Sequence, residues 1–560
     1  MRALGLALLL AAAVPLRAEP LYIVNGLIVD GTGSAPYRGW LAFEGDRITA
    51  MGRDWPPGRL AHDAKMMDAK GMAIAPGFIN MLSWSNESLI ADGRALSDLK
   101  QGITLEVMGE GTSMGPWTEA MKRTREARQD DIKYKVTWTS LADYLDMLEA
   151  KGIAVNVASF VGASTVRVNV LGENNVQPTP EQLAQMQGLV KTAMHEGALG
   201  VGSALIYTPG NYATTAELTA LATAAAQCGG MYISHIRNEG PTIEAALDEI
   251  ISISRNSGAR AEIYHLKQAG RANWGKYADV IARIEAARAA GVNLTADMYS
   301  YDASSTGLDA SMPLWVQEGG IEQWVARLKD PANRARVIAE MKNPPPGETN
   351  SMQEAGGAEK VLLLGFRSEA LKPLTGKTLA EVAAQRGKSA EDTAIDLVIE
   401  DGSRIQVAYF SMNEDNVRRQ VALPWVSFAS DAEAQAPEGV FLKSSTHPRA
   451  YGNFARVLGK FVREEKVISL AEAVRKLSAL PADNLRLPGR GRLLPGNFAD
   501  VVIFDPATIA DTATFAKPQQ LAVGVAHVWV NGVQVLKDGT PTGAPAGRHV
   551  KGPGTGRCPA

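Results

Sequence analysis

The middle of the chain, from about residue 76 to residue 480, repeats two hydrophobic patterns in turn. Short runs of apolar and β-branched residues end abruptly in polar residues, which is typical of buried strands. Segments of helical length lie between several of these runs. Strands that alternate with helices predict a parallel α/β sheet, and seven or more such units favour a closed, TIM-like (β/α)8 barrel. The strand-like runs are 103–110, 153–160, 200–207, 230–235, 261–265, 292–297 and 426–431.

Both ends of the chain carry a different pattern. Apolar residues alternate with polar ones and are interrupted by Asn-Gly and Asp-Gly pairs, which is typical of β-hairpins. Neither end alone is long enough for a stable sandwich, so we predict that the two ends pair into one small β-sandwich domain. These runs are 22–31, 40–49, 499–504 and 527–536.

The predicted domain boundaries follow from these patterns. Residues 19–75 and 481–548 form the two parts of the β-sandwich, and residues 76–480 form the barrel. Within the barrel, residues 302–419 interrupt the alternation and are helical or loop-like, so we predict an insertion at the barrel mouth, where a lid would lie. The Gly/Pro-rich residues 549–560 form a tail.

The first eighteen residues have their own pattern. Arg2 precedes a twelve-residue apolar run, Ala3–Val14, and the small residue Ala18 precedes Glu19. This arrangement predicts a secretory signal peptide over residues 1–18. The alternative, a membrane anchor, is disfavoured because twelve residues cannot span a hydrocarbon core of about 30 Å as a helix. We therefore expect a secreted or periplasmic protein.

Composition narrows the choice of partners. The 560 residues are 46% hydrophobic and 21% charged, with a formal net charge of −3. This near-neutral charge gives no electrostatic reason to expect a nucleic acid or an anionic membrane as partner. The sequence does not specify the oligomeric state. We do not expect a structural disulfide, because Cys228 precedes a predicted strand and Cys558 lies in the tail.

Candidate catalytic groups follow from the barrel prediction, because such groups sit at the carboxyl ends of the strands. Two of the seven histidines, His235 and His265, fall there. Imidazoles and carboxylates from separate strands can converge on one divalent metal. Asp431 could bind the metal, accept a proton from water, or cap a following helix. The strand-end residues are Glu110, Tyr207, His235, His265, Asp297 and Asp431.

Many further segments match one protein family in order along the chain. They include 75–79, 101–104, 205–210, the two histidine segments, 299–307, 430–431, 447–452 and 496–504. On these segments, residues 20–548 resemble the N-acyl-D-amino-acid deacylases (D-aminoacylases) of the amidohydrolase superfamily. The resemblance implies a metallo-hydrolase barrel with a small β-sandwich built from both termini.

The resemblance also implies roles for individual residues. His235 and His265 match metal ligands, and Asp431 matches the general base. Tyr207 matches a residue near the amide oxygen. An acyl amino acid presents an anion that arginine can bind through two hydrogen bonds. The residues that match positions holding the substrate carboxylate or amide are Lys267, Tyr299, Ser305 and Arg449. The alternatives are that Lys267 is a solvated strand end and that the tyrosines only pack in the barrel.

The chain departs from the family pattern at the other metal site. The family has a His-x-His pair after its first strand, where this chain has Leu82 and Trp84, and neither residue can bind the metal. A metal-binding cysteine of the family is replaced by Gly109-Glu-Gly-Thr112. We predict that Glu110 completes a three-ligand site for one Zn²⁺ per chain with the two histidines. The alternative is that Glu110 only orders the loop between two glycines.

The predicted function is metal-dependent hydrolysis of a linear amide, with the deacylation of N-acyl-D-amino acids as the preferred reaction. Metal-activated water would attack the amide, and Asp431 would act as general base. Two alternatives remain open: hydrolysis of another amide or ester, such as a dipeptide or a cyclic amide, and a non-catalytic binding protein. The sequence does not specify the acyl group, the side chain or the D/L preference.

Overall fold

The computed structural model describes residues 19–56 and 64–558. The predicted signal peptide, 1–18, lies outside the described residues. In the described part of the chain, no helix combines the length and the apolar character needed to cross a bilayer.

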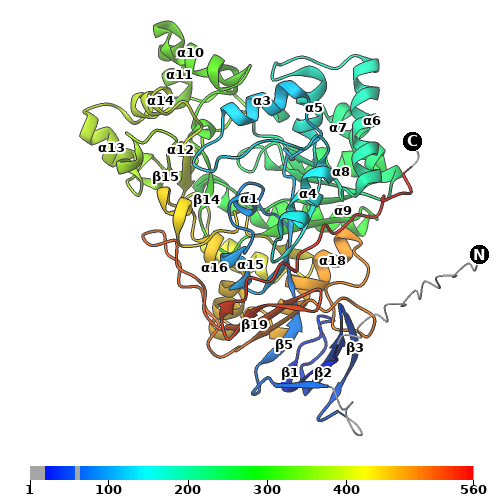
Figure 1. The fold of residues 1–560 in the computed structure, drawn as a ribbon. Coiled ribbons are helices and arrows are strands. Elements are labelled where there is room, and N and C mark those ends of the chain that lie inside the picture. Colours follow the sequence, from blue (N-terminus) through cyan, green and yellow to red (C-terminus); the bar gives the residue numbers. More distant parts are fainter. Residues whose placement is uncertain (1–18, 57–63, 559–560) are drawn as a thin grey trace, which may run out of the picture.

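The centre of the molecule is a closed barrel of parallel strands (Figure 1). The barrel closes where the extension of its first strand meets the end of its last: the Met81 N–H donates to the Phe428 carbonyl at 3.4 Å, and Ser83 forms a parallel bridge to Ala432. The third strand position is shared by two short strands that flank Phe160. In order, the strands are β6 (Phe78–Asn80), β7 (Ile103–Met108), β8 (Asn156–Ser159) with β9 (Val161–Gly162), β10 (Gly200–Ala204), β11 (Met231–His235), β12 (Arg260–Ile263), β13 (Leu294–Met298) and β17 (Val426–Phe428).

The barrel strands bury both faces, as the unbroken apolar runs predict. In β11, Tyr232 packs in the cluster between strands and helices, while its neighbour Ile233 packs in a second cluster with Phe160 and Tyr264. The covering helices include α6 (Pro180–Glu196), α7 (Thr215–Gln227), α8 (Ile243–Ser257) and α9 (Tyr277–Ala289). Helix α6 shows why these segments start where they do: the Thr179 side chain and Gln182 form a capping box, and Pro180 occupies the first turn.

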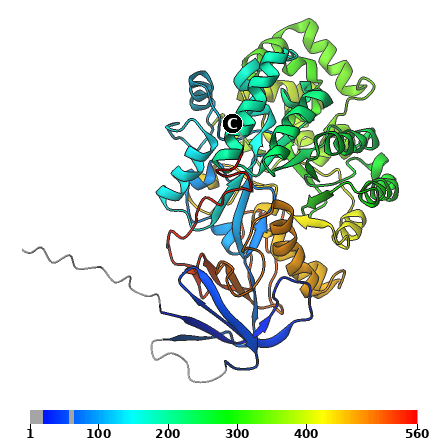
Figure 2. The same ribbon diagram turned by 90° about the vertical axis from the view of Figure 1, so that its right-hand side faces the viewer.

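The two ends of the described chain form a single β domain below the barrel (Figures 1 and 2). Antiparallel pairing of β5 with β18, which places Ile74 opposite Ile503, joins the ends into one nine-stranded sheet. The sheet curls over its own core. This curl brings the rings of Phe43 in β2 and Trp529 in β19 to 6.0 Å from each other. The strands are β1 (Leu21–Ile28), β2 (Tyr37–Glu44), β3 (Arg47–Arg53), β4 (Lys65–Asp68), β5 (Ala73–Pro76), β18 (Val501–Phe504), β19 (Val525–Val530), β20 (Val533–Lys537) and β21 (Thr540–Pro541).

The segment predicted as an insertion is more ordered than expected. It contains an antiparallel sheet of order β14-β16-β15, which the helical or loop-like interpretation missed, and it has its own hydrophobic core. Helix α15 (Glu414–Val421) begins inside the predicted insertion, but it packs into the main hydrophobic cluster of the barrel. Its elements are β14 (Ser304–Gly307), α10 (Ile321–Lys329), α11 (Pro331–Lys342), α12 (Ser351–Ala355), β15 (Val361–Gly365), α13 (Leu379–Arg386), α14 (Ala390–Asp401) and β16 (Gln406–Tyr409).

The expectation of no disulfide is wrong. Cys228 at the end of α7 is bonded to Cys558, with a Cα–Cα distance of 4.8 Å. The tail reaches it by running along the barrel, where the Val550 N–H donates to Val157 and the Gly552 N–H donates to Gly197, both at 2.8 Å. The two cysteines are 330 residues apart, so only the folded path of the tail brings them together.

Candidate active site

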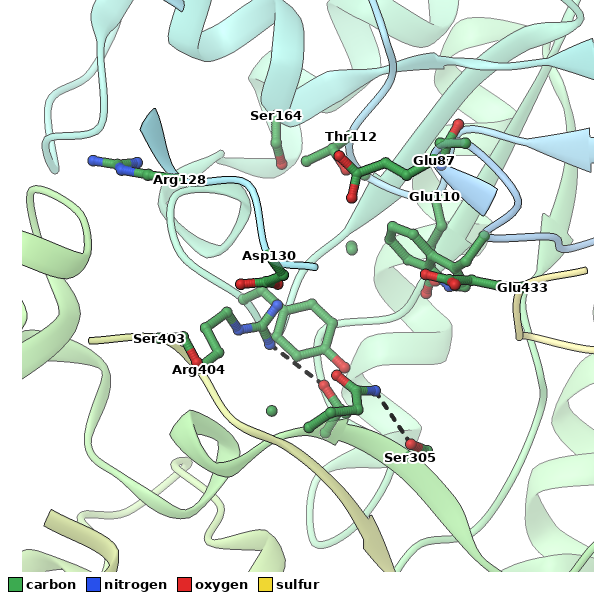
Figure 3. A pocket seen from close by; sticks show the side chains of 18 of the residues that line it. Glu87, Glu110, Thr112, Arg128, Asp130, Ser164, Ser305, Ser403, Arg404 and Glu433 are labelled. Atoms are coloured by element: carbon green, nitrogen blue, oxygen red, sulfur yellow. Dashed lines mark hydrogen bonds between the residues drawn. The ribbon is translucent and has the colours of Figure 1, made fainter. Parts of the chain in front are cut away.

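The carboxyl ends of the barrel strands open into a cavity of about 1260 Å³. In Figure 3, Glu110 and Glu433 enter it from one side, and Arg404 of the insertion lies opposite them. The insertion therefore forms one wall of the cavity. Of the candidate residues, all but Asp297 line it: Glu110, Tyr207, His235, His265, Lys267, Tyr299, Ser305, Asp431 and Arg449.

Glu110 is the meeting point of the two histidines. Its Oε1 atom lies 3.0 Å from Nδ1 of His235 and 2.9 Å from Nε2 of His265. Potential ligand atoms of the three residues lie within 4.8 Å of one another, and all three side chains are buried. The predicted ligands are thus brought together, and Glu110 does more than order its loop.

The two glycines beside Glu110 allow this placement. A Cβ atom on Gly109 would lie 2.3 Å from the Phe160 carbonyl oxygen, and one on Gly111 would lie 2.6 Å from Cβ of Ala204. Both glycines also have positive φ angles, 107° and 64°, which other residues rarely adopt. The Gly-Glu-Gly segment can therefore press against the neighbouring strands and turn the carboxylate inward.

The electrostatics of this cluster favour a cation beside Glu110. Burial raises the pKa of Glu110, but the charge of His265 and the hydrogen bond from His235 outweigh it and leave the pKa below its ordinary value. Burial and Lys267 lower the pKa of His265, while Glu110 and Asp431 outweigh them and raise it to about 10. A divalent cation bound beside Glu110 would supply positive charge at this carboxylate while both imidazoles are neutral.

Glu239 is a site residue that the sequence interpretation missed. Its Oε1 lies 3.2 Å from Nδ1 of His265, and its Oε2 lies 3.5 Å from Nε2 of His235. The Asn238 side chain turns the loop by accepting hydrogen bonds from the N–H groups of Gly240 and Thr242, each at 2.9 Å. The feature of the sequence that could have identified Glu239 is its position four residues after His235, in a segment that was already a candidate.

Lys267 is not a solvated strand end. Its ammonium group donates to Glu239 at 2.5 Å and lies 2.8 Å from Nδ1 of His265, and the side chain is 5% exposed. Its contacts are therefore with the histidine cluster. That it also binds substrate stays a prediction.

Asp431 follows β17 in the left-handed region, with a φ of 49°. Its Oδ1 accepts a hydrogen bond from the Trp84 indole at 3.0 Å, and its Oδ2 pairs with Arg449 at 2.8 Å. The alternative role as a helix cap is wrong, because residues 432–438 are not helical. Asp297 is also explained: its carboxylate accepts the backbone N–H of His265 at 2.7 Å, so it supports the loop.

Arg449 lines the cavity and carries buried donors without partners. Its Nε and Nη1 atoms are buried and have no hydrogen-bond partner among the described residues, and the same is true of the Tyr299 hydroxyl. The guanidinium lies over the Tyr299 ring, 4.4 Å from its centroid. Beneath it, Nδ1 of His447 accepts the Arg449 backbone N–H at 3.0 Å. This grouping is suited to a carboxylate.

Ser305 and Tyr207 line the same cavity with other contacts. The Ser305 hydroxyl donates to the Val407 carbonyl at 2.9 Å and accepts from Gln406 at 3.2 Å (Figure 3). The Tyr207 ring meets the His235 ring edge-on, with centroids 5.2 Å apart. Tyr207 is thus beside the predicted metal ligands, whereas Ser305 is anchored to the insertion.

The comparison with protein families settles the class of this site. The model of the amidohydrolase family, Amidohydro_3, matches residues 65–536. The chain belongs to the amidohydrolase family. Its relatives include a D-aminoacylase of Alcaligenes xylosoxydans xylosoxydans, 33% identical over 94% of this chain and 96% of that protein.

Solved structures agree with this assignment. An N-acyl-D-glutamate deacylase from Bordetella bronchiseptica, complexed with zinc and a phosphonate that mimics the tetrahedral intermediate, matches with a TM-score of 0.77 at 30% identity, over 96% and 100% of the two chains. A D-aminoacylase whose binuclear centre shows one-metal activation and second-metal attenuation matches with the same TM-score and identity, over 95% and 99%. This amidohydrolase therefore has the barrel and additional domain of the D-aminoacylases, as the resemblance implied.

Proposed function

We propose that this amidohydrolase hydrolyses the linear amide of N-acyl-D-amino acids with one Zn²⁺ held by Glu110, His235 and His265. The observation that supports this most directly is that three metal-type ligands, a carboxylate base and an arginine with two unpartnered donor atoms line one cavity. The relatives named above support the substrate class, because they are a D-aminoacylase and an N-acyl-D-glutamate deacylase.

The donor set fits zinc. Two imidazole nitrogens and one carboxylate oxygen are a ligand set of catalytic zinc sites, which keep a further position open. Both histidines also have Glu239 within 3.5 Å of their second nitrogen, and such outer carboxylates orient zinc ligands. When bound, zinc supplies the Lewis acidity that activates water and polarises the amide.

The chain's own residues bind and orient the substrate. Arg449 and Tyr299 offer the substrate carboxylate the donors that are otherwise without partners. A guanidinium can bind a carboxylate through two parallel hydrogen bonds, which sets the orientation of the anion as well as its affinity. Tyr207, beside His235, lies where its hydroxyl can approach the amide. In this proposal the scissile bond lies between the ligand cluster and Asp431.

Asp431 is the proton carrier. Its carboxylate accepts a proton from the attacking water and then delivers it to the nitrogen of the leaving amine. The bond between the acyl carbon and this nitrogen breaks, which releases a carboxylic acid and a free amino acid.

The number of ions and the compartment are also part of the proposal. Leu82 and Trp84 replace the histidine pair of the other metal site, so we expect one ion per chain. A secreted or periplasmic location is supported by the signal-peptide pattern and by the Cys228–Cys558 disulfide, because disulfides persist in oxidising compartments.

The test is turnover on a panel of N-acyl-D- and N-acyl-L-amino acids, dipeptides, lactams and esters, using the chain from residue 19 onward. We expect hydrolysis of N-acyl-D-amino acids that disappears after chelation and returns with Zn²⁺. Preferred cleavage of dipeptides, lactams or esters would contradict the substrate class. Zinc binding without turnover of any compound would identify a non-catalytic binding protein.

A further inference from the structure

Both carboxylate oxygens of Asp431 are engaged by side chains of this chain. Oδ1 accepts the indole N–H of Trp84 at 3.0 Å, and Oδ2 pairs with the guanidinium of Arg449 at 2.8 Å. Trp84 comes from the extension of the first barrel strand, and Asp431 from the end of the last. The indole contact therefore spans the seam where the barrel closes.

The backbone around this seam fixes where the two residues lie. The Asp431 N–H donates to the Leu82 carbonyl at 2.9 Å, and the Trp84 N–H donates to the Ala432 carbonyl at 3.0 Å. Leu82 is fully buried and packs with Ile79 and Leu105. An apolar side chain and an indole thus occupy the positions of the family's histidine pair, beside the carboxylate.

Asp431 needs such contacts because its backbone is strained. A φ of 49° is unfavourable for a residue with a Cβ, and such conformations persist where the surroundings over-determine them. A hydrogen bond to an ionised carboxylate contributes more than one between neutral groups. The Trp84 indole is neutral and cannot bind a metal, since its nitrogen carries the proton and is a donor only.

We propose that Trp84 is a positioning residue that orients Asp431 through its indole N–H, and that Leu82 and Trp84 together exclude a second metal ion. The effect of Trp84 on catalysis rests on the proposed function. The exclusion of a second ion does not. Arg449 pairs with Asp431 through Nη2, and its other donors, Nε and Nη1, are the ones that meet the substrate carboxylate, so a single guanidinium has to serve both anions. The Trp84 contact holds the other carboxylate oxygen of Asp431, so this part of its orientation does not depend on Arg449.

The kinetic test is Trp84→Phe, which keeps an aromatic ring and removes the donor. We expect kcat to fall roughly tenfold to a hundredfold, which is the loss of one hydrogen bond to a charged group, with KM changed less than about twofold. The matched control is Trp315→Phe, whose indole also donates to a carboxylate, that of Glu340 at 2.6 Å, and neither residue lines the cavity. An unchanged kcat, or a rise in KM alone, would overturn the positioning role.

The metal test uses equilibrium dialysis against Zn²⁺ with the bound metal measured directly. We expect one equivalent in the wild type and in Trp84→Phe, and a second equivalent in Leu82→His/Trp84→His, checked for folding by circular dichroism. Two specific equivalents in the wild type would overturn the exclusion of a second ion, even if the double variant does not fold. Because dialysis needs no substrate, a failure of the proposed activity is distinguishable from a failure of this inference.

Discussion

The two nitrogens of His265 face different carboxylates: Nε2 lies 2.9 Å from Glu110, and Nδ1 lies 3.2 Å from Glu239. Lys267 donates to the same Glu239 oxygen at 2.5 Å. Glu239 and Lys267 therefore hold the Nδ1 side of the His265 ring, while Glu110 lies on the side of the predicted ion. Outer carboxylates of this kind raise the basicity of metal-binding histidines.

Glu239→Gln should weaken zinc binding about tenfold to a hundredfold, because the neutral amide no longer orients His265 or balances Lys267. Competition with a chromogenic zinc chelator measures this affinity. Glu244→Gln is a suitable control, since Glu244 pairs with Lys276 at 3.2 Å away from the cluster. Equal zinc affinity in the wild type and in Glu239→Gln would exclude this role.

Removal of a predicted ligand should remove the ion. His235→Ala and His265→Ala should each leave less than about a tenth of an equivalent of zinc after gel filtration, with activity lost in proportion, because two remaining ligands hold zinc poorly. Elemental analysis of the purified variants provides the measurement. His195→Ala, an exposed change in α6, should retain wild-type zinc. Full activity in either ligand variant would contradict the metal site.

Arg449→Lys should raise KM for an N-acyl amino acid roughly tenfold to a hundredfold, because an ammonium cannot reproduce the paired donors of a guanidinium. The corresponding change in the substrate is to convert its carboxylate to a methyl ester, which removes the negative charge that Arg449 would bind. Steady-state kinetics should show that the wild type prefers the free acid and that the variant largely loses this preference. An unaltered preference would place the carboxylate elsewhere.

Glu433 should give the activity a dependence on pH. Burial raises the pKa of Glu433 to about 7; the hydrogen bond from Gln435 lowers it, and the charge of Glu87 adds to the rise. The side chain is neutral below pH 7 and negative above it, so it repels an anionic substrate only at the higher pH. KM should therefore rise severalfold between pH 6 and pH 8, as checked by steady-state kinetics, and Glu433→Gln should remove this rise. The same KM profile in both proteins would disprove the effect.

The disulfide should matter for stability rather than chemistry. The Cys228→Ser/Cys558→Ser variant should lose about 2–5 kcal/mol of unfolding free energy, since the bond closes a long loop of the unfolded chain. Chemical denaturation of both proteins measures the change. Reduction of the wild type should lower its stability to that of the variant, and kcat should be unaffected at temperatures where both are folded. Equal stability of the oxidised wild type and the variant would contradict this expectation.

The positions of the metal-type ligands could be predicted from local sequence. Glu110, His235 and His265 each follow an apolar run, and strands that end in parallel order place such residues at one rim of the barrel. Glu239 was missed because it lies past its strand in a loop, and the turn made by Asn238 is what brings it back to the histidines. Periodicity carries no information about such a turn.

The sequence by itself determined the alternation of strands and helices, the hairpin patterns at both ends, and the strand-end placement of the ligands. These depend on short-range periodicity and on the handedness of strand-helix connections. Only the tertiary structure decided that Trp84 donates to Asp431, 347 residues away, and that Cys228 meets Cys558. Such contacts depend on how the barrel closes and where the tail runs, because side chains distant in sequence meet only after the packed core has set their separation.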